Sequence, residues 1–287
     1  MRNRWAVAAG TALVAATSLG AASFQVLPNV GANGLLHPSR NRLSSDQRRA
    51  EGEDVTFASD GVTLAGWRFP AAGHRRGTIV YLHGVADNRS SSLGAAQRLV
   101  PRGFDVVAFD SRAHGDSGGD VCTYGFYEKR DLARVLDRIG DGPIVVIGSS
   151  LGAAVALQAA AEDARIGAVV AAESFSDLAT VASERAPWFF TKGSIARAFA
   201  VAERSGQFTI DDVNPARAAQ RITVPVFVVH GASDRDTPPD HSRRIFDALH
   251  GPKKLVIVEG AGHNQSLNAA WPAIERWLDE LLPPLDL

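Results

Sequence analysis

The chain has 287 residues, of which 45% are hydrophobic and 21% charged, the balance of a folded globular protein rather than of a disordered chain. Its 30 basic and 31 acidic residues give a formal net charge of −1, so no basic excess favours a nucleic-acid partner. The single cysteine, Cys122, excludes a scaffold built on intrachain disulfides. No His or Cys spacing is typical of a metal site, and we expect neither a metal nor another cofactor.

The N-terminus carries a long uncharged segment. Residues 5–27 follow Arg2 and Arg4, contain no charged side chain and are rich in Ala, Val, Leu and Gly. A positive start before an apolar run is typical of a signal peptide or a membrane anchor, and 23 residues are long enough to span a bilayer. Three interpretations stay open: an uncleaved anchor, a cleaved signal peptide and a surface helix. The first two make the protein membrane-anchored or exported, with its folded domain outside the cytoplasmic membrane.

The sequence predicts three parts. Residues 1–30 are the signal peptide or anchor, residues 31–52 a linker, and residues 53–287 a single folded domain, whose size is ordinary for an α/β protein. No feature of the sequence indicates an oligomeric state.

Short apolar runs alternate with amphipathic or Ala-rich segments along this domain. The expected strands, in chain order, are residues 54–58, 62–69, 78–82, 104–109, 144–147, 168–172, 225–229 and 255–258. The expected helices are residues 91–100, 124–139, 151–161 and 268–282. Such alternation predicts an α/β fold with a mostly parallel central sheet flanked by helices.

Residues 173–221 interrupt this alternation. They show no strand pattern, and a structureless loop of that length is unusual in a compact domain. We therefore expect a small helical lid or cap inserted into the sheet domain. Its aromatic residues Trp188, Phe189 and Phe190 are candidates for lining a substrate pocket. The alternative is a set of ordinary helices that pack on the sheet.

Residues 148–152 read Gly-x-Ser-x-Gly with Ser150 at the centre. An apolar strand is predicted immediately before them and an Ala-rich helix immediately after. In that context the motif predicts a sharp strand-to-helix turn that exposes the serine hydroxyl as a nucleophile. No metal is required, because a serine is activated by a neighbouring base.

The base and its partner acid are expected at the ends of later strands. His263 lies in a Gly-rich loop after the last predicted strand, and Asp234 follows the strand before it. Asp236 is a competing acid. The negative charge that develops during acyl transfer needs N–H donors, which we assign to the backbones of Leu151 and Val85.

Five motifs together resemble the α/β-hydrolase superfamily over roughly residues 53–283. They are His83-Gly84, Asp110 to Gly118, Gly148 to Gly152, His230 to Asp234, and Gly262-His263. The order Ser150, Asp234, His263 is the order of that fold. Within the superfamily the chain is similar to the serine esterase, lysophospholipase and serine-aminopeptidase-like group. Ala113 stands where the second motif usually has Gly.

The resemblance implies a serine hydrolase that cleaves a carboxylic ester, small or lipid-like, through an acyl-enzyme. An acyltransferase or a serine aminopeptidase-like enzyme on the same three residues is the main alternative. A dehalogenase or an epoxide hydrolase would need an Asp nucleophile at Ser150. A non-catalytic binding protein usually lacks one member of the triad, whereas all three are present here.

Overall fold

A computed structural model describes residues 26–47 and 52–284 of the chain. Among these residues eight strands form one sheet in the order β1-β2-β4-β3-β5-β6-β7-β8. The strands are β1 (Glu53–Ser59), β2 (Val62–Phe69), β3 (Gly77–Leu82), β4 (Phe104–Phe109), β5 (Ile144–Ser149), β6 (Ile166–Ala172), β7 (Val226–Gly231) and β8 (Lys253–Val258). The first two strands pair antiparallel, and β3 to β8 are parallel to one another. The predicted mostly parallel sheet is confirmed.

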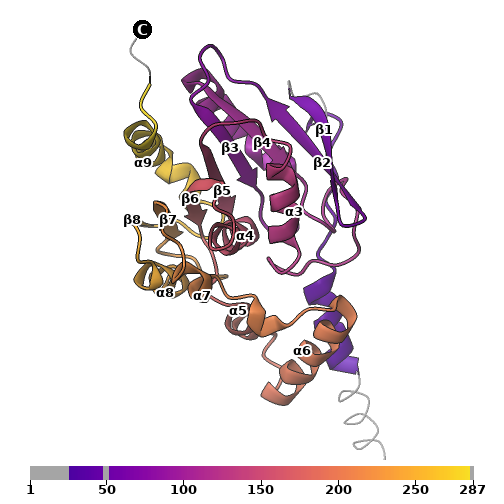
Figure 1. The fold of residues 1–287 in the computed structure, drawn as a ribbon. Helices are drawn as coiled ribbons and strands as arrows, with labels where there is room; N and C mark the ends of the chain where they lie inside the picture. Colours follow the sequence, from indigo (N-terminus) through magenta and orange to yellow (C-terminus); the bar gives the residue numbers. More distant parts are fainter. Residues whose placement is uncertain (1–25, 48–51, 285–287) are drawn as a thin grey trace, which may run out of the picture.

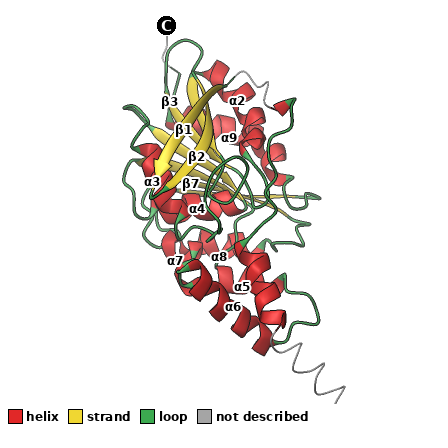
Figure 2. Cartoon of the chain, turned by 90° about the vertical axis from the view of Figure 1, so that its right-hand side faces the viewer, coloured by secondary structure: helices red, strands yellow, loops and turns green. Residues whose placement is uncertain are grey.

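Helices cover both faces of the sheet, as Figures 1 and 2 show. The helices that pack on it are α2 (Leu93–Leu99), α3 (Glu128–Leu136), α4 (Leu151–Ala160), α7 (Pro215–Ala219), α8 (Asp240–Ala248) and α9 (Ser266–Leu281). Alternate residues of each central strand face opposite cores: Val80 packs with α3 and α4, whereas Ile79 packs with α2 and α9. The sheet is therefore the middle layer of three, as expected when buried parallel strands are apolar on both sides.

The stretch between β6 and β7 is helical, as the sequence predicts. It contains α5 (Leu178–Glu184), α6 (Lys192–Gly206), the short 3₁₀ turn η4 (Ile210–Asp212) and α7. In both views α5 and α6 lie together at one end of the molecule, beyond the layered core. They share a small apolar cluster with residues from the start of the described chain, including Leu36.

The first described segment continues as a helix beyond residue 31, where the sequence predicts that a linker begins. Residues 26–36 are helical, and the side chains of Ala32 and Leu36 are buried. Gly31 lies so close to the lid that an added Cβ would be 3.0 Å from the Ala198 Cβ and from the Phe190 ring. Apolar burial against the lid thus orders a segment whose sequence shows only the end of an uncharged run.

The predicted N-terminal anchor or signal peptide, residues 5–27, lies almost wholly outside the described residues and stays a prediction. Within residues 26–47 and 52–284, no helix is both long enough and apolar enough to cross a bilayer.

One predicted helix begins later than expected. The apolar spacing predicts a helix over residues 124–139, whereas α3 begins at Glu128. Tyr124 and Gly125 have positive φ angles of 57° and 118°, which a helix does not allow. The Glu128 carboxylate stabilises this turn, because it accepts hydrogen bonds from the backbone N–H groups of Thr123 and Gly125.

Candidate active site

Ser150 occupies a strained turn between β5 and α4. Its backbone has φ 51° and ψ −111°, a region that costs a non-glycine residue roughly 1–3 kcal/mol. The two flanking glycines make the turn sterically feasible. A Cβ on Gly148 would lie 2.3 Å from the Gly152 backbone, and one on Gly152 would lie 2.2 Å from the Leu82 carbonyl oxygen. The strained backbone of Ser150 therefore places its hydroxyl beside the N-terminus of α4.

The structure brings the three predicted side chains together. The Ser150 Oγ is 3.1 Å from Nε2 of His263, and the Nδ1 of that ring is 2.7 Å from Oδ2 of Asp234. Because the carboxylate can only accept, Nδ1 carries the proton of the neutral ring and Nε2 is left as an acceptor. In this state the imidazole is oriented to take the proton of the serine hydroxyl.

Asp234 is buried and remains ionised. Burial alone would raise its pKa, but hydrogen bonds from His230, from His263 and from the Thr237 backbone lower the pKa below its ordinary value. Asp236, the competing acid, is exposed, and its contact with Asp234 is its backbone N–H, which donates to Oδ1 at 2.9 Å. The geometry therefore favours Asp234 as the partner of His263.

His230 is a contact of this carboxylate that sequence reasoning missed as a functional residue. Its Nε2 lies 2.7 Å from the Thr237 carbonyl oxygen and 3.2 Å from Oδ2 of Asp234. Its Nδ1 lies 2.6 Å from the Ser242 hydroxyl. Since the carbonyl only accepts, Nε2 carries a proton and also faces the carboxylate. The signal was present in the sequence, because His230 ends the same strand that precedes Asp234.

The two expected oxyanion donors both belong to segments that lie next to Ser150. Leu151 is the first residue of α4, and the first N–H groups of a helix have no partner within it. Val85 follows Gly84, where an added Cβ would be only 3.6 Å from the Ser150 Cβ. Val85 also lines the same cleft as Ser150 and His263. Their role in binding an oxyanion stays a prediction.

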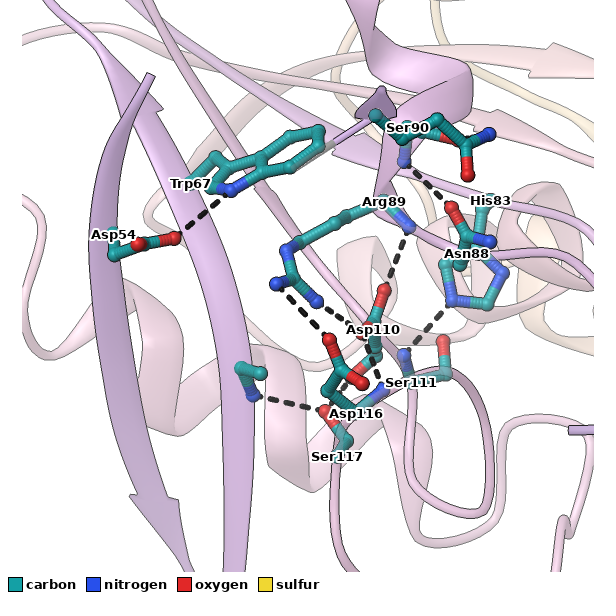
Figure 3. A network of polar contacts seen from close by, with 12 residues as sticks. Asp54, Trp67, His83, Asn88, Arg89, Ser90, Asp110, Ser111, Asp116 and Ser117 are labelled. Carbon is teal, nitrogen blue, oxygen red and sulfur yellow. Dashed lines mark hydrogen bonds and ion pairs between the residues drawn. The ribbon is translucent and has the colours of Figure 1, made fainter. Parts of the chain in front are cut away.

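The loop that carries Val85 is fastened to the turn after β4, as Figure 3 shows. The Ser111 backbone N–H donates to Nε2 of His83 at 2.9 Å, and the Arg89 backbone N–H donates to Oδ1 of Asp110 at 2.7 Å. The Arg89 guanidinium also forms a buried ion pair with Asp110. Attachment on both sides of Val85 fixes the position of its N–H group before a substrate arrives.

Glu173 is a second residue that sequence reasoning missed. It directly follows β6, is fully buried and has a positive φ of 56°. Its carboxylate accepts hydrogen bonds from the backbone N–H groups of Asn264, Gln265 and Ser266, which immediately follow His263. A carboxylate at the end of a strand was the same signal that identified Asp234.

Two adjoining cavities lie at this site. A polar cleft of about 720 Å³ contains Ser150, His263 and charged residues from α5 and the loop after β7. An apolar chamber of about 510 Å³ lies between residues 30–38, α5 and α6. Val85 and Arg185 line both cavities, so the chamber begins beside the reactive groups.

The lid aromatics are placed only partly as predicted. Phe189 and Phe190 line the apolar chamber. Trp188 does not: its side chain is 95% exposed and packs edge-on against Phe189. The prediction for Trp188 is therefore wrong, because the turn between α5 and α6 directs this ring outward.

Within the two described stretches of chain, no group of three or more His, Cys, Asp or Glu side chains is placed to hold a metal ion. The groups available for chemistry are the Ser150 hydroxyl, the His263 imidazole and the oriented N–H donors around them.

Comparison with known proteins identifies the fold family. A family model described as "alpha/beta hydrolase fold" matches residues 77–213, and one described as "TAP-like protein" matches residues 203–284. The protein YfhR of Escherichia coli K12 is 28% identical over 249 residues, which is 83% of this chain and 82% of YfhR.

Solved structures show the same fold. The Pyrococcus furiosus esterase Pf2001 aligns with a TM-score of 0.65 at 23% identity, over 85% of this chain and 96% of that one. The Pyrococcus horikoshii acylaminoacyl peptidase aligns with a TM-score of 0.66 at 15% identity, over 82% of this chain but only 42% of the peptidase. With the fold, the order of the three residues and the family models in agreement, the chain belongs to the α/β-hydrolase superfamily.

Proposed function

We propose that the protein is a serine hydrolase that cleaves carboxylic esters through an acyl-enzyme. The observation that carries the proposal is the connected series from the Ser150 hydroxyl through His263 to Asp234, at 3.1 and 2.7 Å. A non-catalytic protein on this fold would have no reason to keep a strained serine in line with a buried, ionised carboxylate.

The residues act in a defined order. The Ser150 oxygen attacks the ester carbonyl while His263 takes its proton at Nε2, and the N–H groups of Val85 and Leu151 bind the resulting oxyanion. Collapse of the intermediate breaks the bond to the alcohol, which receives the proton back from His263. Water then repeats the sequence on the acyl-enzyme, releasing the acid and restoring the serine.

The apolar chamber favours an ester with an apolar acyl or alcohol group as substrate. The name of the Pyrococcus furiosus neighbour, an esterase, agrees with this choice. The Pyrococcus horikoshii neighbour is named a peptidase, so an aminopeptidase-like activity and acyl transfer to another acceptor are the alternatives on the same residues.

A fluorophosphonate probe and p-nitrophenyl acetate test the proposal. We expect the wild-type protein to be labelled and to hydrolyse the ester, and Ser150→Ala to lose both properties while its circular dichroism spectrum is unchanged. Ser149→Ala is the matched control, because it removes the neighbouring hydroxyl and keeps the Ser150 hydroxyl 3.1 Å from Nε2 of His263. Hydrolysis that persists in Ser150→Ala would refute the assignment. Faster cleavage of aminoacyl p-nitroanilides than of esters would favour the peptidase alternative.

We also propose that the enzyme works outside the cytoplasmic membrane, because of the uncharged residues 5–27 behind two arginines. Fractionation of cells that produce the full chain tests this. Recovery of the protein only in the cytosolic fraction would contradict it.

A further inference from the structure

The helix of residues 26–36 lies outside both family models, which begin at residues 77 and 203, yet it forms a wall of the chamber beside Ser150. We propose that this helix, α5 and α6 together bind the long hydrocarbon chain of an ester lipid. The lipid enters from a bilayer that contacts the rim of the chamber, formed by Val26, Val30, Trp188 and Phe189. The inference rests on the proposed function, because the chamber leads to the same serine.

The chemistry of the chamber suits a hydrocarbon chain. Its lining is almost entirely apolar, and Arg185 is the charged side chain among the lining residues. That guanidinium is already engaged, because it donates to the Asp236 carbonyl oxygen and to the Thr237 hydroxyl at 2.8 and 2.5 Å. Apolar walls without free polar groups stabilise a methylene chain and disfavour a polar or charged one.

The chamber connects with the reactive groups at Val85. This residue lines both the chamber and the cleft that holds Ser150 and His263, and its backbone N–H is the expected donor to the oxyanion. A carbonyl held by that N–H would therefore have the chamber on one side. A volume of about 510 Å³ lies within the range of sites that enclose an entire small ligand.

The helix of residues 26–36 packs tightly against the lid and is therefore a fixed part of the chamber lining. Ala32 and Leu36 join the apolar cluster of the lid, and Gly31 closely approaches both Phe190 and Ala198. Figure 1 shows this helix, in indigo, beside α6 in orange. The opposite holds at Gly34, which lines the chamber and where an added Cβ would meet nothing within 4 Å. A side chain placed at Gly34 would therefore be accommodated without a clash, at the exposed edge of the chamber.

The rim gathers the exposed large apolar side chains of the described residues. They are Val26, Val30, Trp188 and Phe189, with exposed fractions of 54%, 56%, 95% and 50%. Two of them, Val30 and Phe189, also line the chamber. Apolar residues gathered on one face of a soluble domain mark an interaction surface.

The amino-acid sequence indicates that the partner of this rim is a lipid bilayer. The uncharged stretch of residues 5–27 includes Val26, the first residue of the rim, and no charged residue occurs between Arg4 and Arg40. A segment of that composition partitions into a membrane. It would hold the rim at the bilayer surface, where a Trp ring is a favoured contact.

Chain-length dependence tests the binding site. The full-length protein is assayed with p-nitrophenyl acetate and p-nitrophenyl decanoate, and we expect kcat/KM to be at least roughly tenfold higher for decanoate. Gly34→Leu should lower kcat/KM for decanoate by roughly tenfold and change that for acetate by less than about twofold. Gly94→Leu is the matched control, because Gly94 is an equally open, exposed helical glycine in α2, away from the chamber.

A second variant, on α5, tests the same chamber if Gly34→Leu disturbs the helix of residues 26–36. Ala182→Leu, on α5, should shift the same preference toward short chains, because Ala182 also lines the chamber. If wild-type protein shows no preference for decanoate, or if neither variant changes it, the chamber is not the chain site. Acetate hydrolysis that still depends on Ser150 would then leave the proposed function standing.

The bilayer is tested with decanoyl ester incorporated in phosphatidylcholine vesicles. A rim variant, Trp188→Gln, keeps residues 5–27 and every residue that lines the chamber, so any difference from wild type reports the rim alone. We expect its turnover of the vesicle-borne ester to fall at least roughly fivefold while acetate hydrolysis in solution is unchanged. Equal turnover of the vesicle-borne ester by both proteins would overturn the docking of the rim.

Discussion

Glu173 holds Ser266 by two hydrogen bonds to a single carboxylate oxygen, from the backbone N–H at 2.9 Å and from the hydroxyl at 2.6 Å. Ser266 is the first residue of α9, and Glu173 directly follows β6. The contact therefore attaches the loop that carries His263 to the edge of the sheet next to the nucleophile. Among the described residues, the donors to the Glu173 carboxylate belong to residues 264–266, so we expect Glu173 to position the His263 loop rather than to take part in the reaction.

Replacing Glu173 by Gln should lower kcat by roughly 10- to 100-fold and leave KM for p-nitrophenyl acetate nearly unchanged. The amide nitrogen of Gln is a donor and would face other donors, so the His263 loop would move away from Ser150. We also expect the free energy of unfolding to fall by about 1–3 kcal/mol, the cost of buried polar groups left without partners. Steady-state kinetics and urea unfolding measure the two effects.

Ser266→Ala is the control for this prediction. It removes only the hydroxyl donor and keeps the three backbone N–H groups, so kcat should change by less than about threefold. A Glu173→Gln variant with wild-type kcat would show that the His263 loop holds its position without the carboxylate.

The fold and the three residues of the candidate triad could be predicted from the sequence because their signals are local. An apolar strand, a Gly-x-Ser-x-Gly turn and an Ala-rich helix follow one another directly in the chain. Asp234 and His263 each follow a clear apolar run that predicts a strand.

Other features depend on contacts between distant segments. Glu173 acts on residues about ninety positions away, and the helix of residues 26–36 is ordered by packing on a lid that follows much later. Trp188 and Phe189 are neighbours with the same apolar character, yet only one lines the chamber. No single-chain pattern distinguishes them, because the direction of the turn between α5 and α6 decides which ring faces inward.

Asp234→Asn should reduce kcat by roughly 10⁴-fold, the effect of the equivalent change in a serine protease triad. The amide would present a donor to Nδ1 of His263 and favour the wrong tautomer. Asp236→Asn should retain activity within about twofold, because the contact of Asp236 with Asp234 is made by its backbone N–H, which Asn keeps. A large loss in Asp236→Asn, with a small loss in Asp234→Asn, would exchange the roles of the two residues.

Gly152→Ala should yield a protein without measurable esterase activity and with greatly reduced stability. The added Cβ would lie 2.2 Å from the carbonyl oxygen of Leu82, a backbone atom that cannot rotate away. Gly94→Ala adds the same methyl group to an open helical position and should be neutral or slightly stabilising, by less than about 1 kcal/mol. Thermal unfolding compares the two, and a Gly152→Ala protein of wild-type Tm would contradict the tight approach of α4 to β3.

His114 should make the protein lose stability as the pH falls below neutrality. Its ring is buried, Nδ1 donates to the Arg112 carbonyl oxygen at 2.9 Å, and Nε2 has no hydrogen-bond partner among the described residues. Burial, with smaller contributions from His83 and Arg40, lowers the pKa of His114 to about 4. In the unfolded chain a histidine has a pKa near 6.5, so between these two values the unfolded state binds the extra proton.

The sign follows from that difference in bound protons. The contribution of His114 to the free energy of unfolding is fully present above pH 6.5 and is lost as the pH falls toward 4, by about 3 kcal/mol in all. His114→Phe keeps the ring but cannot bind a proton, so its free energy of unfolding should decrease less between pH 7 and pH 4. Urea unfolding at several pH values measures both curves, and carboxylate titration is common to the two proteins, so it cancels in their difference. Parallel curves would mean that the native state accommodates a protonated His114, which its buried position beside His83, with ring centroids 5.2 Å apart, disfavours.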